Sequence, residues 1–366
     1  MRTLEGYAPR RGLSIPCVTA LGPDGEPLDA DQRRLVRFLI AGGRGADVIF
    51  AMGTTGEWNR LDQERRHRVI RVTVEEVRKH NGSLELAPGE AVEAWVGITA
   101  PTCAETLETL ELALEIGAEG AVIAPLAIRD VSDPVRFIAR DIADLLDARN
   151  QRIPLFLYDN SDIAAGSVPY LRTHWVKQLS RLDFVRGIKV SAAPRRLGHY
   201  TKAAAQFRDL GAFAIYVGNA LHILDLMRPR ESWWGRLALQ WHRFLLHDLL
   251  PAGVVSGPAN LWPREWRRAW QVAQAGDVER MAELKQIFER FGETYRFPAG
   301  KRSLAALKRG LALRGVLSCD AVARGTAPLD PEQRAHFDAG FEALRADVER
   351  ILPAWATSDP GDAEER

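Results

Sequence analysis

Eight short apolar segments, separated by stretches with helical periodicity, constrain the fold of this chain more than any other feature. The segments are apolar along their whole length instead of alternating with polar residues, which is typical of parallel strands that helices cover on both faces. Eight consecutive strand and helix units predict a closed (β/α)8 barrel, the TIM barrel of the α/β class. The segments are residues 13–18, 47–52, 95–98, 120–124, 153–158, 185–190, 213–217 and 253–256.

The connecting segments carry signals for helix ends. Asp29 with Gln32, and Thr102 with Glu105, have the spacing of a capping box, in which two side chains close the first turn of a helix. Gly42 stands where the first of these helices would end. The competing architecture, a doubly wound sheet, would normally carry a glycine-rich nucleotide fingerprint after its first strand. The sequence CVTALGPDG has neither that fingerprint nor a phosphate-loop lysine, so the barrel is favoured.

The chain has 366 residues, whereas a barrel of this kind occupies about 250. We expect the barrel over residues 12–276, a C-terminal helical extension over 277–356 and a disordered tail over 357–366, where small and acidic residues dominate. Helical patterns cover residues 262–275, 277–295 and 332–352.

Two longer connections interrupt the alternation of strands and helices. Residues 82–93 are expected to form a surface loop before the third strand. Residues 228–250 contain a helical pattern rich in aromatic side chains, which favours a long helix packed on the barrel or on a partner subunit. A lid over the active site is the alternative interpretation. The aromatic residues are Trp233, Trp234, Trp241 and Phe244.

Charge and motif content narrow the class of partner. Lysine and arginine number 49 against 48 for aspartate and glutamate, so the net charge of +1 gives no long-range attraction to nucleic acid or to an anionic membrane. The sequence has no apolar run of about 18 residues and no apolar core of a secretory signal near its start, so we expect a cytoplasmic protein. Cys17, Cys103 and Cys319 form no CxxC pair and the histidines form no HExxH motif, so we expect neither a metal nor a cofactor.

Three chemically reactive groups stand at the ends of predicted strands. The run GTTGE, residues 53–57, directly follows the second strand, while Tyr158 ends the fifth and Lys189 ends the sixth. In a TIM barrel the carboxyl ends of the strands meet at one mouth, where the active site is built. We therefore expect the three groups to lie together.

Their combined chemistry fits a reaction of a keto acid. A lysine flanked by Gly187, Ile188 and Val190 is poorly hydrated, and desolvation is expected to lower the pKa of its amine toward neutrality. A neutral Lys189 can attack a ketone and form a Schiff base, and the Tyr158 hydroxyl can move the protons that this requires. The backbone N–H groups and hydroxyls of GTTGE can bind a carboxylate at the start of a helix. Each group alone has a plainer interpretation, as a surface lysine, a core aromatic or a turn, but their order favours a site.

The ordered set of GTTGE, the tyrosine and the GIK lysine resembles the family of dihydrodipicolinate synthase and N-acetylneuraminate lyase, over residues 12–295. The resemblance implies a class I lyase or aldolase in which Lys189 forms a Schiff base with pyruvate or another 2-keto acid and Tyr158 is the general acid and base. It also implies a homodimer or a homotetramer. The substrate-binding residues that it implies are Gly53, Thr54, Thr55, Ser191, Gly218, Asn219 and Val255.

Departures from the family pattern bear on the substrate. The synthases usually have a tyrosine pair after the fourth strand, where this chain has Leu126 and Ala127, and an arginine shortly after the catalytic tyrosine, which this chain lacks. Ser191 resembles the hydroxyl residue with which sugar-acid lyases hold a polyol chain, whereas Asn219 and Ala220 replace the acidic residues of the sialic acid enzymes. Further pocket candidates, each of which can equally be a solvated loop residue, are Asp159, Asn160, Asp162, Arg129 and Arg195.

The sequence predicts a Schiff-base lyase that releases or condenses pyruvate, with a 2-keto-3-deoxy sugar acid as the favoured substrate class. Three alternatives stay open: a dehydratase of a keto-deoxy sugar acid that uses the same imine, dihydrodipicolinate synthase itself, and a barrel that binds a keto acid without turnover. The sequence leaves open the aldehyde half of the substrate, the stereochemistry and the direction of the reaction.

Overall fold

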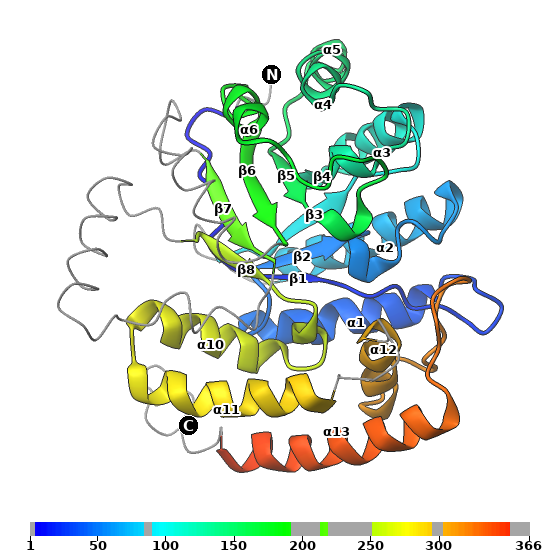
Figure 1. The fold of residues 1–366 in the computed structure, drawn as a ribbon, viewed down its shortest axis with the longest axis vertical. Coiled ribbons are helices and arrows are strands. Elements are labelled where there is room, and N and C mark those ends of the chain that lie inside the picture. Colours follow the sequence, from blue (N-terminus) through cyan, green and yellow to red (C-terminus); the bar gives the residue numbers. More distant parts are fainter. Residues whose placement is uncertain (1–3, 84–89, 192–212, 219–250, 295–302, 352–366) are drawn as a thin grey trace.

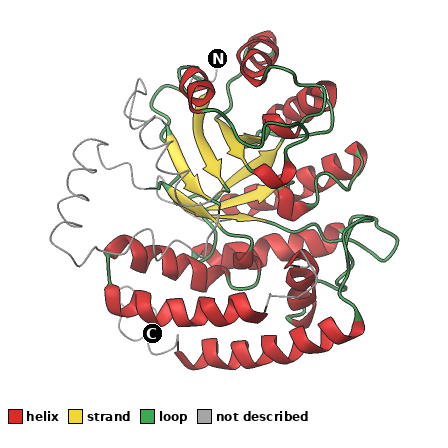
Figure 2. Ribbon diagram, viewed as in Figure 1, coloured by secondary structure: helices red, strands yellow, loops and turns green. Residues whose placement is uncertain are grey.

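The computed structural model describes residues 4–83, 90–191, 213–218, 251–294 and 303–351. In this part of the chain eight parallel strands close into a barrel in sequence order, with β1 hydrogen-bonded to β8. Helices surround the strands (Figures 1 and 2), so the predicted (β/α)8 barrel is confirmed. The strands are β1 (Gly12–Pro16), β2 (Val48–Ala51), β3 (Glu93–Gly97), β4 (Gly120–Ile123), β5 (Leu155–Asp159), β6 (Val185–Val190), β7 (Ala214–Val217) and β8 (Gly253–Val255).

The helices fall into two groups. Those that follow the strands include α1 (Asp29–Ile40), α2 (Gln63–Gly82), α3 (Cys103–Glu115), α4 (Pro134–Arg136), α5 (Ala143–Ala148), α6 (Thr173–Leu179) and α10 (Pro263–Ala275). A π-helical turn, Phe137–Ile142, joins α4 to α5. The C-terminal helices are α11 (Val278–Thr294), α12 (Ser303–Leu313) and α13 (Pro331–Ile351). In Figure 1, α10, α11 and α13 form successive layers on one side of the barrel, and α12 stands across one end of these layers.

Three aromatic rings fill the interior of the barrel. Trp95 and Phe156 stack with their ring centroids 3.9 Å apart, and Tyr216 meets Trp95 edge-on at 5.2 Å. Glycines on the strands make room for these rings: a Cβ at Gly120 would lie 2.7 Å from Trp95, and one at Gly253 would lie 2.8 Å from Tyr216. The middle of the barrel is therefore packed, and open space for a ligand has to lie at a mouth.

One of the two predicted capping boxes is wrong. Helix α1 begins after Leu28, which is extended and makes no side-chain cap. Gln32 is buried, and its amide oxygen instead accepts a hydrogen bond from the backbone N–H of Ala20, while its amide nitrogen donates to Thr73. The amide thus serves the loop between β1 and α1, because buried backbone groups there need partners. The expected end of this helix is nearly correct, since the chain turns left-handed at Ala41 and Gly42.

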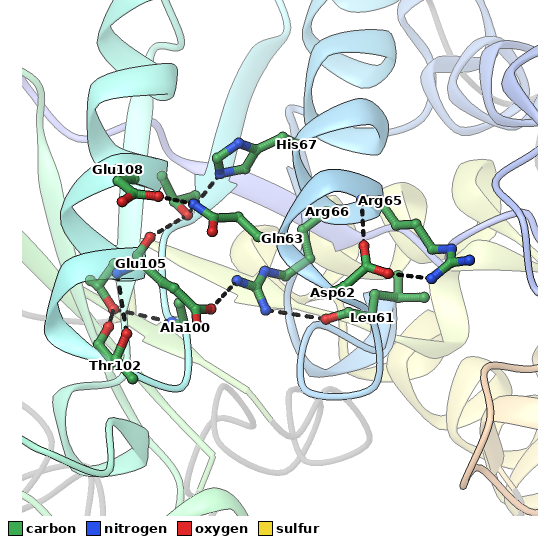
Figure 3. Close-up of polar contacts among 12 residues, drawn as sticks. Leu61, Asp62, Gln63, Arg65, Arg66, His67, Ala100, Thr102, Glu105 and Glu108 are labelled. Atoms are coloured by element: carbon green, nitrogen blue, oxygen red, sulfur yellow. Dashed lines mark hydrogen bonds and ion pairs between the residues drawn. The ribbon is translucent and has the colours of Figure 1, made fainter.

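The second predicted cap is confirmed in part. The Thr102 hydroxyl accepts from the Glu105 N–H at 3.3 Å and so caps α3. The Glu105 carboxylate does not return to Thr102, but accepts from Arg66 of α2 at 2.6 Å, while Arg66 also donates to the Leu61 carbonyl (Figure 3). The polar first turns of α2 and α3 are thereby joined.

Several sequence predictions lie outside the described residues: the structure of the aromatic connection at 228–250, the positions of Asn219 and Arg195, and the tail at 357–366. The boundaries at residues 276 and 356 stay predictions. Helix α12 was not among the helical patterns recognised in the sequence. No helix in the described part of the chain has the length and apolar character needed to cross a membrane.

Candidate active site

Lys189 and Tyr158 lie side by side at the carboxyl ends of β6 and β5. The two residues are direct partners in the parallel register of these strands. The Lys189 Nζ lies 3.9 Å from the centre of the Tyr158 ring and 5.3 Å from the centre of the Phe50 ring. Both side chains are 7% exposed. No carboxylate in the described part of the chain lies within ion-pair distance of this amine, so aromatic faces supply its nearest described electrostatic contacts.

The Tyr158 hydroxyl is the centre of a small polar network. It lies 3.3 Å from the Thr54 hydroxyl and accepts a hydrogen bond of 3.0 Å from the Asn160 amide nitrogen. Ser191 is a further polar neighbour that favours the ionised form of this hydroxyl. Burial alone would raise the pKa of the Tyr158 phenol, but the positive charge of Lys189 and these hydrogen bonds outweigh it, so the pKa lies below its ordinary value.

The GTTGE run forms a tight turn beside this pair. Thr54–Gly56 is a short 3-10 helix, closed by hydrogen bonds from the N–H groups of Gly56 and Glu57 to the carbonyls of Gly53 and Thr54. The N–H groups of Thr54 and Thr55 make no backbone hydrogen bond within the described residues. Gly53 is required by close packing, because a Cβ there would lie 2.8 Å from the Phe50 ring. The turn therefore offers two N–H groups and two hydroxyls to an anion.

The two threonines of this turn face different parts of the barrel mouth. Thr54 faces Tyr158, whereas the Thr55 hydroxyl oxygen lies 3.6 Å from the position of a Cβ on Gly257, in the segment after β8. That segment contains the 3-10 helix Pro258–Asn260, in which the buried Asn260 binds the carbonyl of Pro16 at 2.9 Å. The mouth is thus lined from β2, β5, β6 and β8.

Glu57, the last residue of GTTGE, is an anchor of the turn. It has a left-handed backbone (φ 60°) and is 1% exposed. Its carboxylate accepts from the Lys308 Nζ of α12 at 2.5 Å and from the Ala323 N–H at 2.8 Å. Lys308 is fully buried and also donates to the Ala321 carbonyl at 2.9 Å. Both ends of this ion pair are therefore hydrogen-bonded, as a buried pair requires.

Ser191 and Gly218 fit closely together at the ends of β6 and β7. The Ser191 N–H donates to the Asp159 carbonyl and the Gly218 N–H to the Val190 carbonyl. A Cβ on Gly218 would lie 2.1 Å from the Ser191 hydroxyl oxygen. The hydroxyl therefore occupies space that any side chain at position 218 would take.

Other predicted pocket residues have different positions. Val255 is buried in β8 opposite Ser14 of β1 and belongs to the barrel wall. Asp159 is 1% exposed and accepts from the Leu171 N–H at 2.8 Å, so its side chain fixes the connection after β5. Asn160 reaches the Tyr158 hydroxyl, and its neighbour Asp162 lies in the turn that follows.

Comparison with known proteins agrees with this arrangement. Residues 9–126 match the model of the Dihydrodipicolinate synthetase family. The 4-hydroxy-tetrahydrodipicolinate synthase of Acidovorax sp. (strain JS42) is 25% identical over 284 residues, which cover 76% of this chain and 79% of that protein. These matches show a similarity to the dihydrodipicolinate synthetase family. The resemblance predicted from the three strand-end groups is confirmed.

Solved structures show the same fold. Dihydrodipicolinate synthase from the commensal bacterium Bacteroides thetaiotaomicron is similar with a TM-score of 0.72 and 23% identity, covering 92% of this chain and 99% of that one. YagE, a prophage protein of the dihydrodipicolinic acid synthase family from E. coli K12 in complex with pyruvate, has a TM-score of 0.69 and 19% identity, with 92% and 99% covered.

The structure gives two residues roles that the sequence did not predict. Asn160 was one pocket candidate among several, and only the structure shows its contact with Tyr158. Lys308 was not recognised at all, although a lysine within the apolar run SLAALKRGLAL was a signal for a buried partner. At the positions of the family's tyrosine pair, Leu126 and Ala127 form a 3-10 turn with Pro125 after β4.

Proposed function

We propose that the protein is a Schiff-base lyase in which Lys189 forms an imine with a 2-keto acid. The observation that carries the proposal is the contact of the Lys189 amine with the Tyr158 ring, together with a Tyr158 hydroxyl held by Thr54. The amine and the phenol are thus adjacent in a buried site, as imine formation with proton transfer requires. The relationship to lyases and aldolases supports the same chemistry.

The proposed reaction starts with attack of the neutral Lys189 amine on the C2 carbonyl of the keto acid. The carbinolamine takes up a proton on its oxygen and loses water, which leaves an iminium. The iminium then accepts the electron pair of the C3–C4 bond, so an aldehyde leaves and an enamine remains. Protonation of the enamine at C3 and hydrolysis release pyruvate and the free lysine. Thr54 and Thr55 hold the substrate carboxylate during these steps.

The leading reaction is retro-aldol release of pyruvate from a 2-keto-3-deoxy sugar acid. Ser191 supports this substrate class, because its hydroxyl lies beside Tyr158, where a polyol chain would extend from the imine. Loss of a β-hydroxyl from the same imine would give a dehydratase. We also propose that the protein acts as a homodimer or homotetramer.

A second candidate is condensation of pyruvate with an aldehyde in the manner of a 4-hydroxy-tetrahydrodipicolinate synthase. The name of the Acidovorax relative favours it. Leu126 and Ala127 count against it, because neither can relay a proton to Tyr158.

The test is trapping of the imine. The protein is incubated with pyruvate and borohydride, and the labelled peptide is identified by mass spectrometry. A reduced adduct on Lys189, absent in Lys189→Ala, is expected. Tyr158→Phe is the matched control, since it keeps the ring under the amine and should still form the adduct, but more slowly. Failure of the wild-type protein to label, under conditions where a known pyruvate lyase labels, would overturn the proposal.

A further inference from the structure

Asn160 has a fixed orientation toward the Tyr158 hydroxyl. Its amide oxygen accepts a hydrogen bond from the Asp162 N–H at 3.1 Å, and its amide nitrogen points to the Tyr158 oxygen at 3.0 Å. The reverse orientation of the amide would place an NH2 group against the Asp162 N–H, where two donors would face each other. The group that faces Tyr158 is therefore a hydrogen-bond donor.

A donor in this position determines what the phenol can do. The Tyr158 oxygen has to accept the hydrogen bond from Asn160, and the ammonium form of Lys189 lies close to the same ring. Both interactions are stronger with a phenolate than with a neutral phenol. Among the described residues in contact with the hydroxyl, Thr54, Ser191 and Asn160 are uncharged, so Lys189 is the charged group that acts on it. The Asp159 carboxylate accepts a hydrogen bond from the Leu171 N–H, away from the Tyr158 hydroxyl.

An amide cannot pass a proton on. A tyrosine or a water at this place could donate a proton and take up another, whereas the amide of Asn160 stays protonated at any ordinary pH. Leu126 and Ala127 cannot relay protons either. The proton that Tyr158 removes from the substrate therefore cannot move on through Asn160, Leu126 or Ala127, and the described hydroxyl next to it is that of Thr54.

We propose that Asn160 is a positioning residue that stabilises Tyr158 as a phenolate, so that Tyr158 can act as the base of the reaction and later as its acid. The inference rests on the proposed function. The phenolate takes the proton from the hydroxyl at C4 of the iminium. The C3–C4 bond breaks, its electrons form the enamine and the aldehyde leaves. The phenol then returns the same proton to C3, which restores the phenolate before the imine is hydrolysed.

The first measurement is a titration of the phenol in protein that carries 13Cζ-labelled tyrosine. The chain has six tyrosines, and Tyr158→Phe identifies the resonance of interest. Burial of their hydroxyls raises the pKa of Tyr7 and that of Tyr216, so these two tyrosines titrate above Tyr158. Asn160→Ala is expected to raise the pKa of Tyr158 by about one to two units, the usual strength of a hydrogen bond to a charged group.

Asn160→Asp is the matched variant. It keeps a side-chain oxygen that can accept from the Asp162 N–H, but replaces the donor by a carboxylate. We expect the rising limb of kcat/KM with pH to move upward in both variants, with a loss of about 10- to 100-fold at neutral pH. A phenol titration and pH profile like those of the wild type in Asn160→Asp would overturn the inference, because only the loop contact would then matter.

Borohydride trapping separates this inference from the proposed function. Wild type, Asn160→Ala and Asn160→Asp should all label on Lys189 with pyruvate. Labelling with unchanged phenol titrations leaves the proposed function intact and overturns the role of Asn160. Absence of labelling in the wild type overturns the proposed function and, with it, the inference, whatever the phenol titrations show.

Discussion

Among single residues, Gly218 controls the space in which the Ser191 hydroxyl lies. Any Cβ at position 218 would lie 2.1 Å from that hydroxyl oxygen and 3.1 Å from the Ser191 Cα. The hydroxyl can turn away, but it then loses its polar interaction with Tyr158. The glycine thus acts on the site through its neighbour.

We predict that Gly218→Ala and Ser191→Ala lower kcat/KM to a similar extent, by about 5- to 10-fold, the usual effect of one lost hydrogen bond. The double variant should be no worse than either single one, because both changes remove the same contact. Steady-state kinetics on the substrate identified by screening provide the measurement. Losses that multiply in the double variant would mean that Gly218 acts independently of Ser191.

The sequence predicted the positions of the strand-end residues correctly, but it did not predict which side chains form hydrogen bonds with them. Tyr158 and Lys189 were placed correctly at adjacent strand ends, since parallel strands of a barrel bring their carboxyl ends together. The hydrogen bond from Asn160 depends on the turn after β5, whose path no periodicity encodes. The burial of Asp159, which the sequence left as a pocket candidate, has the same cause.

Among the elements, α12 holds the GTTGE turn in place through Lys308. The buried ammonium and the buried Glu57 carboxylate satisfy each other, and the Ala321 carbonyl and Ala323 N–H complete the hydrogen bonds of the pair. Breaking a buried pair by removing one partner leaves an uncompensated charge in the protein interior.

We predict that Lys308→Met lowers the free energy of unfolding by about 3–5 kcal/mol. The double variant Glu57→Gln with Lys308→Met should be more stable than Lys308→Met alone, since the amide introduced at position 57 can still accept from the Ala323 N–H without a buried charge. Urea denaturation gives both values. Lys285→Met, on α11, is the control for loss of a lysine. Equal effects of the two lysine variants would contradict the anchoring role.

Helix patterns showed where α1, α3, α10, α11 and α13 run, but not what their polar residues do. The Gln32 side chain was expected to cap α1 and instead binds the loop after β1. Helix α12 is short, and seven of its eleven residues are leucine or alanine on more than one face, so periodicity alone could not distinguish it from another buried segment. Both the role of Gln32 and the burial of α12 depend on tertiary contacts, which the spacing of residues in the sequence does not reveal.

In the molecule as a whole, the two ends of the barrel differ in chemistry. The mouth at the carboxyl ends carries Lys189 and Tyr158, whereas the opposite end carries a group of acidic residues. There Glu93 accepts from the Trp95 indole at 2.8 Å. Burial raises the pKa of the Glu93 carboxyl to about 7. The hydrogen bond from Trp95 lowers this pKa, whereas the negative charge of Glu119 raises it further. Burial also raises the pKa of Asp47.

We predict that Glu93 makes the protein less stable as the pH rises from about 4.5 to about 7. Between these values the folded protein keeps a proton that the unfolded chain has lost, so stability present at lower pH disappears. The loss is about 3 kcal/mol at most, at about 1.4 kcal/mol for each pKa unit. Glu93→Gln keeps an acceptor for Trp95 and should flatten the dependence. Unfolding free energies of both proteins at several pH values test this; parallel curves would contradict it.

The distance along the chain between Glu57 and Lys308 has a consequence for synthesis. These partners are 251 residues apart. At about 5–20 residues per second, a ribosome needs roughly 13–50 s to make the second after the first. During that time the Glu57 carboxylate of the nascent chain has no Lys308 ammonium with which to pair. The anchor of the GTTGE turn is therefore completed only after α12 has been translated, and a prematurely terminated product without α12 lacks the partner of Glu57.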